Sequence, residues 1–296
     1  TAQCPTRCQL MRRFFVVLTA AQSIPDSAAA EVLAHLTAFG ALPGEPRRLA
    51  PWAIEIPVLS EARPECPPLA SLDVNVVPAE GRKKTLLLAD MDSTIIPVEC
   101  IDELADFAGV KDQVSAITEA AMAGELDFED AIDARVALLK DLPLSALQTC
   151  FDERITLNPG ARALVAGMKA AGGTCALVSG GFTFFTGRVA ELTGFDSHVA
   201  NTLDMAGERL AGTVARPILG RAAKAERLHQ LCAEFSITPG EVMAIGDGAN
   251  DLDMVQLAGL GVAYHAKTAL SEKADARLDH SDLRAPLALM GLPLPT

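Results

Sequence analysis

Four short apolar runs after residue 84 constrain the fold of this chain most strongly. They are "TLLLA" (85–89), "TCALVS" (174–179), "VMAIG" (242–246) and "LGVAY" (260–264). Uninterrupted runs of this kind are typical of strands that are buried on both faces of a parallel sheet. Helical patterns separate the later runs, at 161–171, 183–193, 221–235 and 250–258. The sequence therefore predicts an α/β fold built on a doubly wound, Rossmann-like parallel sheet.

A long helical segment, about 99–155, separates the first run from the second. It contains "DFEDAIDARVALLKDL", in which Asp127 is placed as a helix N-cap. An insertion directly after the first strand lies over the carboxyl edge of the sheet, where open α/β sheets bind their ligands. We therefore predict a helical cap over about 97–156 that acts as a lid.

Residues 1–80 have a different pattern, in which strand-like stretches at 14–19, 52–58 and 72–77 accompany a helix at about 27–39. This order predicts a small α+β module at 1–80, followed by the main domain at 81–296. The segment 11–23 resembles a targeting signal in having a basic start and an apolar stretch. We favour a strand there, because a capped amphipathic helix follows directly.

Charge and composition exclude several classes of partner. The formal net charge of −13 disfavours nonspecific binding to nucleic acid or to an anionic membrane. No apolar run approaches the roughly 18–20 residues that span a bilayer. The seven cysteines form no CxxC pair, which predicts reduced thiols in a cytoplasmic protein.

Polar residues follow three of the predicted strands. They are Asp90 and Asp92 after the first, Ser179 and Gly180 after the second, and Asp247, Asn250 and Asp251 after the third. The carboxyl ends of parallel strands meet at one edge, so at least four carboxylates would share one crevice and would need a cation. Oxygen ligands without thiolate or imidazole favour Mg²⁺.

Each of these motifs also has an ordinary structural explanation when it is taken alone. Asp90 and Asp92 could form an Asx turn, Ser179 could cap a helix, and Lys224 could be a solvated helix lysine. The prediction of a site rests on their occurring together, in order, at one edge of the sheet.

The four motifs "DMDST", "SGG", Lys224 and "GDGANDLDM" resemble those of the haloacid dehalogenase superfamily of phosphohydrolases. More narrowly, "VECIDELA" and "GDGANDLDM" resemble the phosphoserine phosphatase family, and the match covers about residues 83–282. The N-terminal part is similar in position to an ACT-type module. It departs from that pattern because a Pro-rich stretch (64–68) replaces the second helix. Such a module would allow a homodimer.

The resemblance implies Mg²⁺-dependent hydrolysis of O-phospho-L-serine through an aspartyl-phosphate. In that family Asp90 would be the nucleophile and Asp92 the general acid and base. Mg²⁺ would be held by Asp90, Asp247 and the backbone carbonyl of Asp92, with Asp251 in support. The phosphate would contact Ser179, Gly180, Lys224 and Asn250.

The resemblance also implies how the substrate's amino-acid part would be recognised. Glu99 would bind the ammonium and Arg135 the carboxylate, while Met122 and Phe128 would be apolar lid residues. Without the resemblance, ordinary helix-surface and core roles would be favoured for all four. Two other functions stay open: another phosphatase or phosphotransferase of the superfamily, and a non-enzymatic sensor of phosphoserine or serine. The full set of acids argues against the sensor.

Overall fold

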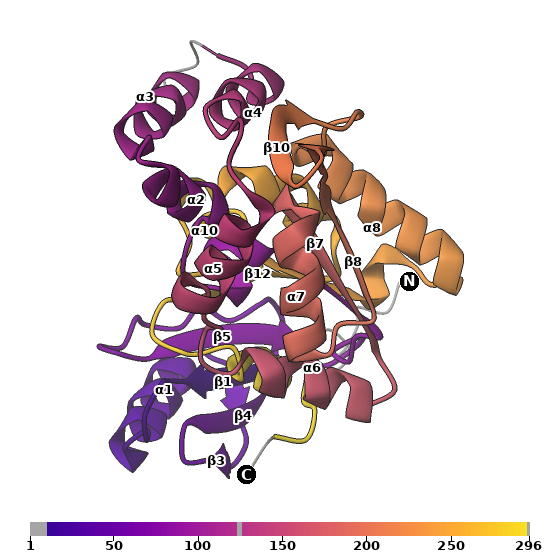
Figure 1. Ribbon diagram of the computed structural model, residues 1–296. Coiled ribbons are helices and arrows are strands. Elements are labelled where there is room, and N and C mark those ends of the chain that lie inside the picture. Colours follow the sequence, from indigo (N-terminus) through magenta and orange to yellow (C-terminus); the bar gives the residue numbers. More distant parts are fainter. Residues whose placement is uncertain (1–10, 123–125, 295–296) are drawn as a thin grey trace.

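The computed structural model describes residues 11–122 and 126–294, and two large β-sheets lie next to each other in it (Figure 1). The first sheet is formed by β1 (Arg12–Thr19), β2 (Leu42–Pro43), β3 (Arg47–Ala50), β4 (Ala53–Ser60) and β5 (Asp73–Pro78), with helix α1 (Asp26–Ala38) after β1. The strands are antiparallel in the order β2-β4-β1-β5, and β3 also pairs with β4.

Strand β1 shows why this sheet is covered on both faces. Successive strand residues point to opposite faces. Val16 and Leu18 accordingly pack in the cluster that includes α1, while Val17 joins the larger core on the other face. The strands and helix expected in this region are present with shifted ends, and the Pro-rich stretch 64–68 forms no helix. The short strands β2 and β3 were not predicted, because the segment "GALPGEPRR" that contains β2 and the start of β3 has the Gly, Pro and Arg residues of a loop.

The second sheet confirms the predicted parallel architecture. Its strands are β6 (Leu86–Ala89), β7 (Thr174–Phe182), β8 (Ser197–Asn201), β11 (Val242–Gly246), β12 (Leu260–Tyr264) and β13 (Ala276–Leu278). The order is β13-β12-β11-β6-β7-β8, and every neighbouring pair is parallel. Strand β6, which leads into the acid pair, therefore lies at the centre of the sheet between β11 and β7.

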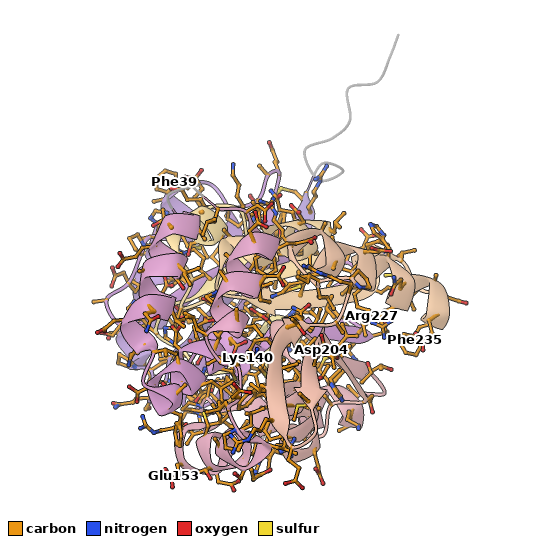
Figure 2. All side chains as sticks on the ribbon, turned by 45° about the horizontal axis from the view of Figure 1, so that its top comes forward. Phe39, Lys140, Glu153, Asp204, Arg227 and Phe235 are labelled. Atoms are coloured by element: carbon orange, nitrogen blue, oxygen red, sulfur yellow. The ribbon has the colours of Figure 1, made fainter. Side chains whose placement is uncertain are left out.

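Helices cover both faces of this sheet. One group is α6 (Ala161–Ala170), α7 (Thr183–Thr193) and α11 (Ala285–Leu289), and the other is α8 (Arg221–Phe235) and α9 (Leu252–Leu257). Leu87 packs in the cluster with the first group, whereas Leu86 and Leu88 pack with the second. Figure 2 shows Phe235, the last residue of α8, at the periphery of the molecule. The short helix α10 (Thr268–Ser271) follows β12.

A helical cap lies beyond the carboxyl edge of the parallel sheet, and its helices α3 and α4 are at the top of Figure 1. It consists of α2 (Cys100–Ala108), α3 (Lys111–Met122), α4 (Phe128–Ala137) and α5 (Leu144–Arg154). The Asp127 side chain caps α4 by accepting a hydrogen bond from the Asp130 backbone N–H at 2.8 Å, as predicted. The hairpin β9 (Leu203–Ala206) and β10 (Arg209–Val214), which was not predicted, lies against α4.

Buried polar side chains join the N-terminal sheet to the main domain. The Asp73 carboxylate accepts hydrogen bonds from the backbone N–H of Asp279 at 2.8 Å and from the Ser281 hydroxyl at 2.6 Å. The Glu55 carboxylate forms an ion pair with Arg82, which also donates to the Leu289 carbonyl at 2.7 Å. The domain boundary near residue 80 and the ACT-like character of the first sheet stay predictions. In residues 11–122 and 126–294, no helix is long and apolar enough to cross a membrane.

Candidate active site

The polar residues at the ends of β6, β7 and β11 meet at a cavity of about 600 Å³, which the cap covers. The predicted residues that line this cavity are Asp90, Asp92, Glu99, Phe128, Arg135, Gly180, Asp247 and Asn250. Ser179, Lys224 and Asp251 are fully buried directly behind the lining. The topology thus brings together, from distant parts of the sequence, the residues that the motifs singled out.

A buried ion-pair cluster surrounds Asp90. The Lys224 ammonium lies 2.7 Å from Asp90 Oδ1 and 2.6 Å from Asp251 Oδ1. Burial raises the pKa of Asp90 well above its usual value, Asp251 raises it further, and Lys224 opposes both. Burial would lower the pKa of Lys224, but the two carboxylates raise it above the usual lysine value. Lys224 therefore stays charged and offsets part of the negative charge of the cluster.

Hydrogen bonds hold both oxygens of the Asp92 carboxylate. Oδ1 accepts from the Cys100 backbone N–H at 3.0 Å, and Oδ2 accepts from the Ser179 hydroxyl at 3.1 Å. Burial raises the pKa of Asp92, while these hydrogen bonds lower it. Gly181 packs closely against this carboxylate, because a Cβ at position 181 would lie 2.6 Å from Asp92 Oδ2 and would displace it. Asp92 is thus fixed in orientation and favoured in its protonated form.

The acids at the cavity fit a hard metal ion. Asp90, Asp247 and Asp251 each place an oxygen within 4.8 Å of the others. Both Asp251 oxygens already have partners, since one accepts from Lys224 and the other from the backbone N–H of Asp247 and Gly248. Burial and the nearby Asp251 raise the pKa of Asp247 to about 6. Asp90 and Asp247 are therefore the acids left to bind a cation, which would offset their repulsion.

Three charged side chains from the cap line the cavity, those of Glu99, Asp102 and Arg135. The Ser93 hydroxyl donates to Glu99 Oε1 at 2.7 Å. Burial and the neighbouring Asp92 raise the pKa of Glu99 to about 7. Arg135 Nε donates to the Ala131 carbonyl at 3.1 Å, and burial lowers the pKa of this guanidinium. Within the described residues, no carboxylate lies at ion-pair distance from Arg135. The cap thus supplies two carboxyl groups, those of Glu99 and Asp102, and one guanidinium without an ion-pair partner among the residues described.

The lid pair expected from the sequence is described only in part. Phe128, at the start of α4, approaches two glycines of the main domain: a Cβ on Gly220 would lie 3.0 Å from its ring, and one on Gly180 would lie 3.5 Å from it. Phe128 therefore connects the cap to the end of β7 and to the start of α8. Met122 is the last residue of α3, and its side chain lies outside the described residues.

Several residues near the site were not predicted, and Lys267 and Asn201 are two of them. Lys267 lines the cavity, and its charge lowers the pKa of Asp247 against the effect of burial. Lys267 comes three residues after the end of β12. It could have been predicted from the sequence, because the residues that follow parallel strands lie at the edge where the site forms. Asn201, the last residue of β8, donates to the Gly180 carbonyl at 2.8 Å. No sequence signal marked it, because β8 itself was not predicted.

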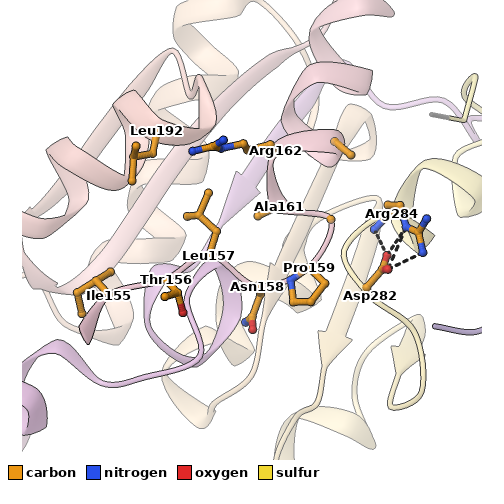
Figure 3. Close-up of a pocket in the computed structure, with 12 residues that line it drawn as sticks. Ile155, Thr156, Leu157, Asn158, Pro159, Ala161, Arg162, Leu192, Asp282 and Arg284 are labelled. Atoms are coloured by element: carbon orange, nitrogen blue, oxygen red, sulfur yellow. Dashed lines mark hydrogen bonds and ion pairs between the residues drawn. The ribbon is translucent and has the colours of Figure 1, made fainter. Parts of the chain in front are cut away.

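A second, more open hollow lies away from the acids (Figure 3). It has a volume of about 780 Å³ and is lined by residues 155–163 with Leu192, Asp282 and Arg284. The Asp282 carboxylate and the Arg284 guanidinium bond to each other at 2.7 Å, as the dashed lines in Figure 3 show. Since its acid is already paired, the smaller cavity with the carboxylate cluster is the candidate active site.

The fold and this acid cluster define a hydrolase class that sequence comparison identifies independently. The haloacid dehalogenase-like hydrolase family matches residues 87–256, more than half of the chain, and the chain belongs to this family. Phosphatases of the family in general use a metal ion, which agrees with the acid cluster. The phosphoserine phosphatase of Archaeoglobus fulgidus is 42% identical over 213 residues, which cover 72% of this chain and 62% of that protein. The match thus spans less than two thirds of the archaeal relative.

Solved structures show the same likeness. A HAD family hydrolase from Salmonella enterica serovar Typhi has a TM-score of 0.84 at 29% identity, covering 95% of this chain and 99% of that one. A phosphoserine phosphatase solved as a phospho-aspartyl intermediate analogue has a TM-score of 0.64 at 41% identity, covering 69% of this chain and 98% of that one.

Proposed function

We propose that this chain hydrolyses O-phospho-L-serine to L-serine and phosphate through an aspartyl-phosphate. The observation that carries the proposal is the position of Asp90 beside Asp92, in a cavity that also presents Glu99 and Arg135. The pair Asp90 and Asp92 alone would suit many phosphate esters. A carboxylate and a guanidinium on the cap, by contrast, match the ammonium and the carboxylate of an amino acid. The relatives named phosphoserine phosphatase support this substrate.

In the first half-reaction Asp90 is the nucleophile. Its Oδ1 accepts hydrogen bonds from the Met91 backbone N–H and from Lys224, and these bonds orient the carboxylate that attacks phosphorus. The bond between phosphorus and the serine oxygen breaks, and protonated Asp92 gives its proton to that oxygen. The raised pKa of Asp92 favours the protonated form that this step needs.

In the second half-reaction Asp92 acts as the base. Its carboxylate takes a proton from the attacking water, the bond between phosphorus and the Asp90 oxygen breaks, and phosphate leaves. The hydrogen bonds from Cys100 and Ser179 keep the carboxylate in one orientation through both steps. The same residue can serve twice because each step returns the proton that the other one uses.

The metal ion of the site is proposed to be Mg²⁺, held by Asp90, Asp247 and the backbone carbonyl of Asp92. When it is bound, Mg²⁺ offsets the negative charge shared by the nucleophile and the phosphate. Lys224 supplies a second positive charge behind Asp90. The Gly180 N–H and the Asn250 side chain are proposed to donate to the phosphate oxygens.

Recognition of the amino-acid part falls to the cap. The carboxylate of Glu99 would pair with the substrate ammonium, and the Arg135 guanidinium would bind the substrate carboxylate with two parallel hydrogen bonds. Phe128 is proposed to exclude water from the closed cavity. The cytoplasmic location and a homodimer through the N-terminal sheet remain proposals that rest on sequence patterns.

Phosphate release from a panel of phosphorylated amino acids and sugars tests the function. The expected result is strong preference for phosphoserine with Mg²⁺ and no release with a chelator. Equal rates on sugar phosphates would contradict the substrate assignment. Adding a second alcohol as acceptor and analysing the products would reveal phosphotransfer in place of hydrolysis.

A further inference from the structure

We propose that Asn201 is a positioning residue for the reaction, which fixes the Gly180–Gly181 peptide at the phosphate side of the site and, through it, Asp92. This inference rests on the proposed function, because it concerns the same acid and base. Asn201 is 2% exposed and does not line the cavity, so it acts through its neighbours and does not touch the substrate.

The Asn201 side chain makes three hydrogen bonds to backbone groups. Its Nδ2 donates to the Gly180 carbonyl at 2.8 Å and to the Leu219 carbonyl at 3.2 Å. Its Oδ1 accepts from the Leu219 N–H at 2.6 Å. The amide thus joins the end of β7 to the segment that leads into α8.

The end of β7 needs such a partner. The register between β7 and β8 is regular as far as Val178 and Val199, then shifts before Phe182 pairs with Asn201. Residues 179–181 are therefore outside the regular ladder, and two of them are glycines, which have the most conformational freedom to lose. The Asn201 side chain supplies a hydrogen bond that the regular ladder does not.

A continuous series of hydrogen bonds runs from Asn201 to Asp92. Asn201 holds the carbonyl of the Gly180–Gly181 peptide, whose N–H donates to Ser179 Oγ at 2.8 Å. The Ser179 hydroxyl in turn donates to Asp92 Oδ2 at 3.1 Å. All donors point in one direction, so each bond polarises the next. Loss of the first bond frees the peptide that orients Ser179 and hence the general acid.

The second branch reaches Lys224. Leu219 directly precedes the Gly220 N-cap of α8, and Lys224 lies in the first turns of that helix, where it pairs with Asp90. The Asn201 side chain, at the edge of the sheet, therefore restrains two segments. One is the end of β7 beside Asp92, and the other is the start of α8, whose Lys224 pairs with Asp90.

The test compares Asn201→Ala and Asn201→Asp with the matched control Asn75→Ala. Asn75 is also a buried strand asparagine, and its amide exchanges two hydrogen bonds of 2.8 Å with the Arg277 backbone, far from the cavity. Asn201→Asp keeps the shape and the acceptor for the Leu219 N–H but cannot donate when ionised. We measure kcat and KM for phosphoserine and the thermal midpoint of every variant.

Both Asn201 variants should lower kcat by about ten- to a hundredfold, the range that follows from small misplacement of catalytic groups, with a smaller change in KM. Asn75→Ala should lower the thermal midpoint, because it loses buried hydrogen bonds, and should leave kcat close to that of the wild type. If Asn201→Ala does not fold, the kcat and KM of Asn201→Asp test the inference against the same expected changes.

Two results would overturn the inference: kcat unchanged in the Asn201 variants, or an equal loss of kcat in Asn75→Ala. In either case, wild-type turnover of phosphoserine would leave the proposed function standing. A wild type that does not hydrolyse phosphoserine would instead refute the function, and this inference with it.

Discussion

Replacement of Arg135 by alanine should change substrate selectivity more than it changes the reaction itself. The Arg135 guanidinium lines the cavity and uses Nε for the Ala131 carbonyl. Within the described residues, no carboxylate lies at ion-pair distance from it; burial lowers its pKa, and the nearby Asp102 and Glu99 oppose this. Its two terminal nitrogens are therefore free to bind a carboxylate of the substrate.

The size of the effect follows from the hydrogen bonds that are lost. A hydrogen bond to a charged group contributes about 1.5–3 kcal/mol. One factor of ten in kcat/KM corresponds to about 1.4 kcal/mol, so Arg135→Ala should reduce kcat/KM for phosphoserine by about ten- to a hundredfold for each of the two hydrogen bonds that is lost. Arg135→Lys keeps the charge but not the planar pair of donors, so its loss should be intermediate.

The assay measures kcat/KM for phosphoserine and for phosphoethanolamine, which has the amine and the phosphate but no carboxylate. Hydrolysis of phosphoethanolamine should barely change. Arg154→Ala is the matched control, since Arg154 also lies in the cap but pairs with Glu103 at 3.4 Å and does not line the cavity. Equal losses on both substrates would refute the reasoning, because Arg135 would then stabilise the cap and not bind the amino acid.

Three further outcomes are expected. Asp90→Asn should abolish phosphate release, because an amide cannot form the acyl phosphate, while Asp253→Asn, which breaks only a surface ion pair with Arg221, should remain active. Removal of metal by a chelator should stop turnover and added Mg²⁺ should restore it; activity that persists in chelator would argue against a metal-assisted reaction. A chain starting at residue 81 should lose at least about 5 °C in thermal midpoint, because Arg82 and Ser281 lose their buried partners Glu55 and Asp73, and an unchanged midpoint would show that the N-terminal sheet is independent.

The parallel sheet was predictable because each of its central strands can be recognised from a few consecutive apolar residues. Strands buried on both faces contain uninterrupted apolar runs, and β6, β11, β12 and the Cys175–Val178 part of β7 follow this rule. The site was predictable for the same reason. Once the strands are parallel, the residues that follow them, such as Asp90 and Asp247, must meet at one edge.

The edge strands were not predictable. Strand β8 ("SHVAN") is mostly half-exposed, and β13 ("ARL") has three residues, so neither forms an apolar run. Each is a strand because a neighbour provides hydrogen bonds along its length. Asn201 was not predicted because β8 was not predicted. The role of this asparagine depends on the backbone groups of Gly180 and Leu219 that its side chain contacts, and these are distant in the sequence.

The final partners of the site residues depend on distances that no sequence pattern specifies. The sequence pointed to Ser179 as a phosphate donor, and in the folded chain its hydroxyl donates to Asp92. Lys224, an ordinary helix lysine by its sequence, is buried between two carboxylates. Local patterns determine which segments are strands and helices, because burial and periodicity act over a few residues. The direction of a side chain and the pKa of its group are set by neighbours that lie far apart in the chain, so they emerge only when the elements pack.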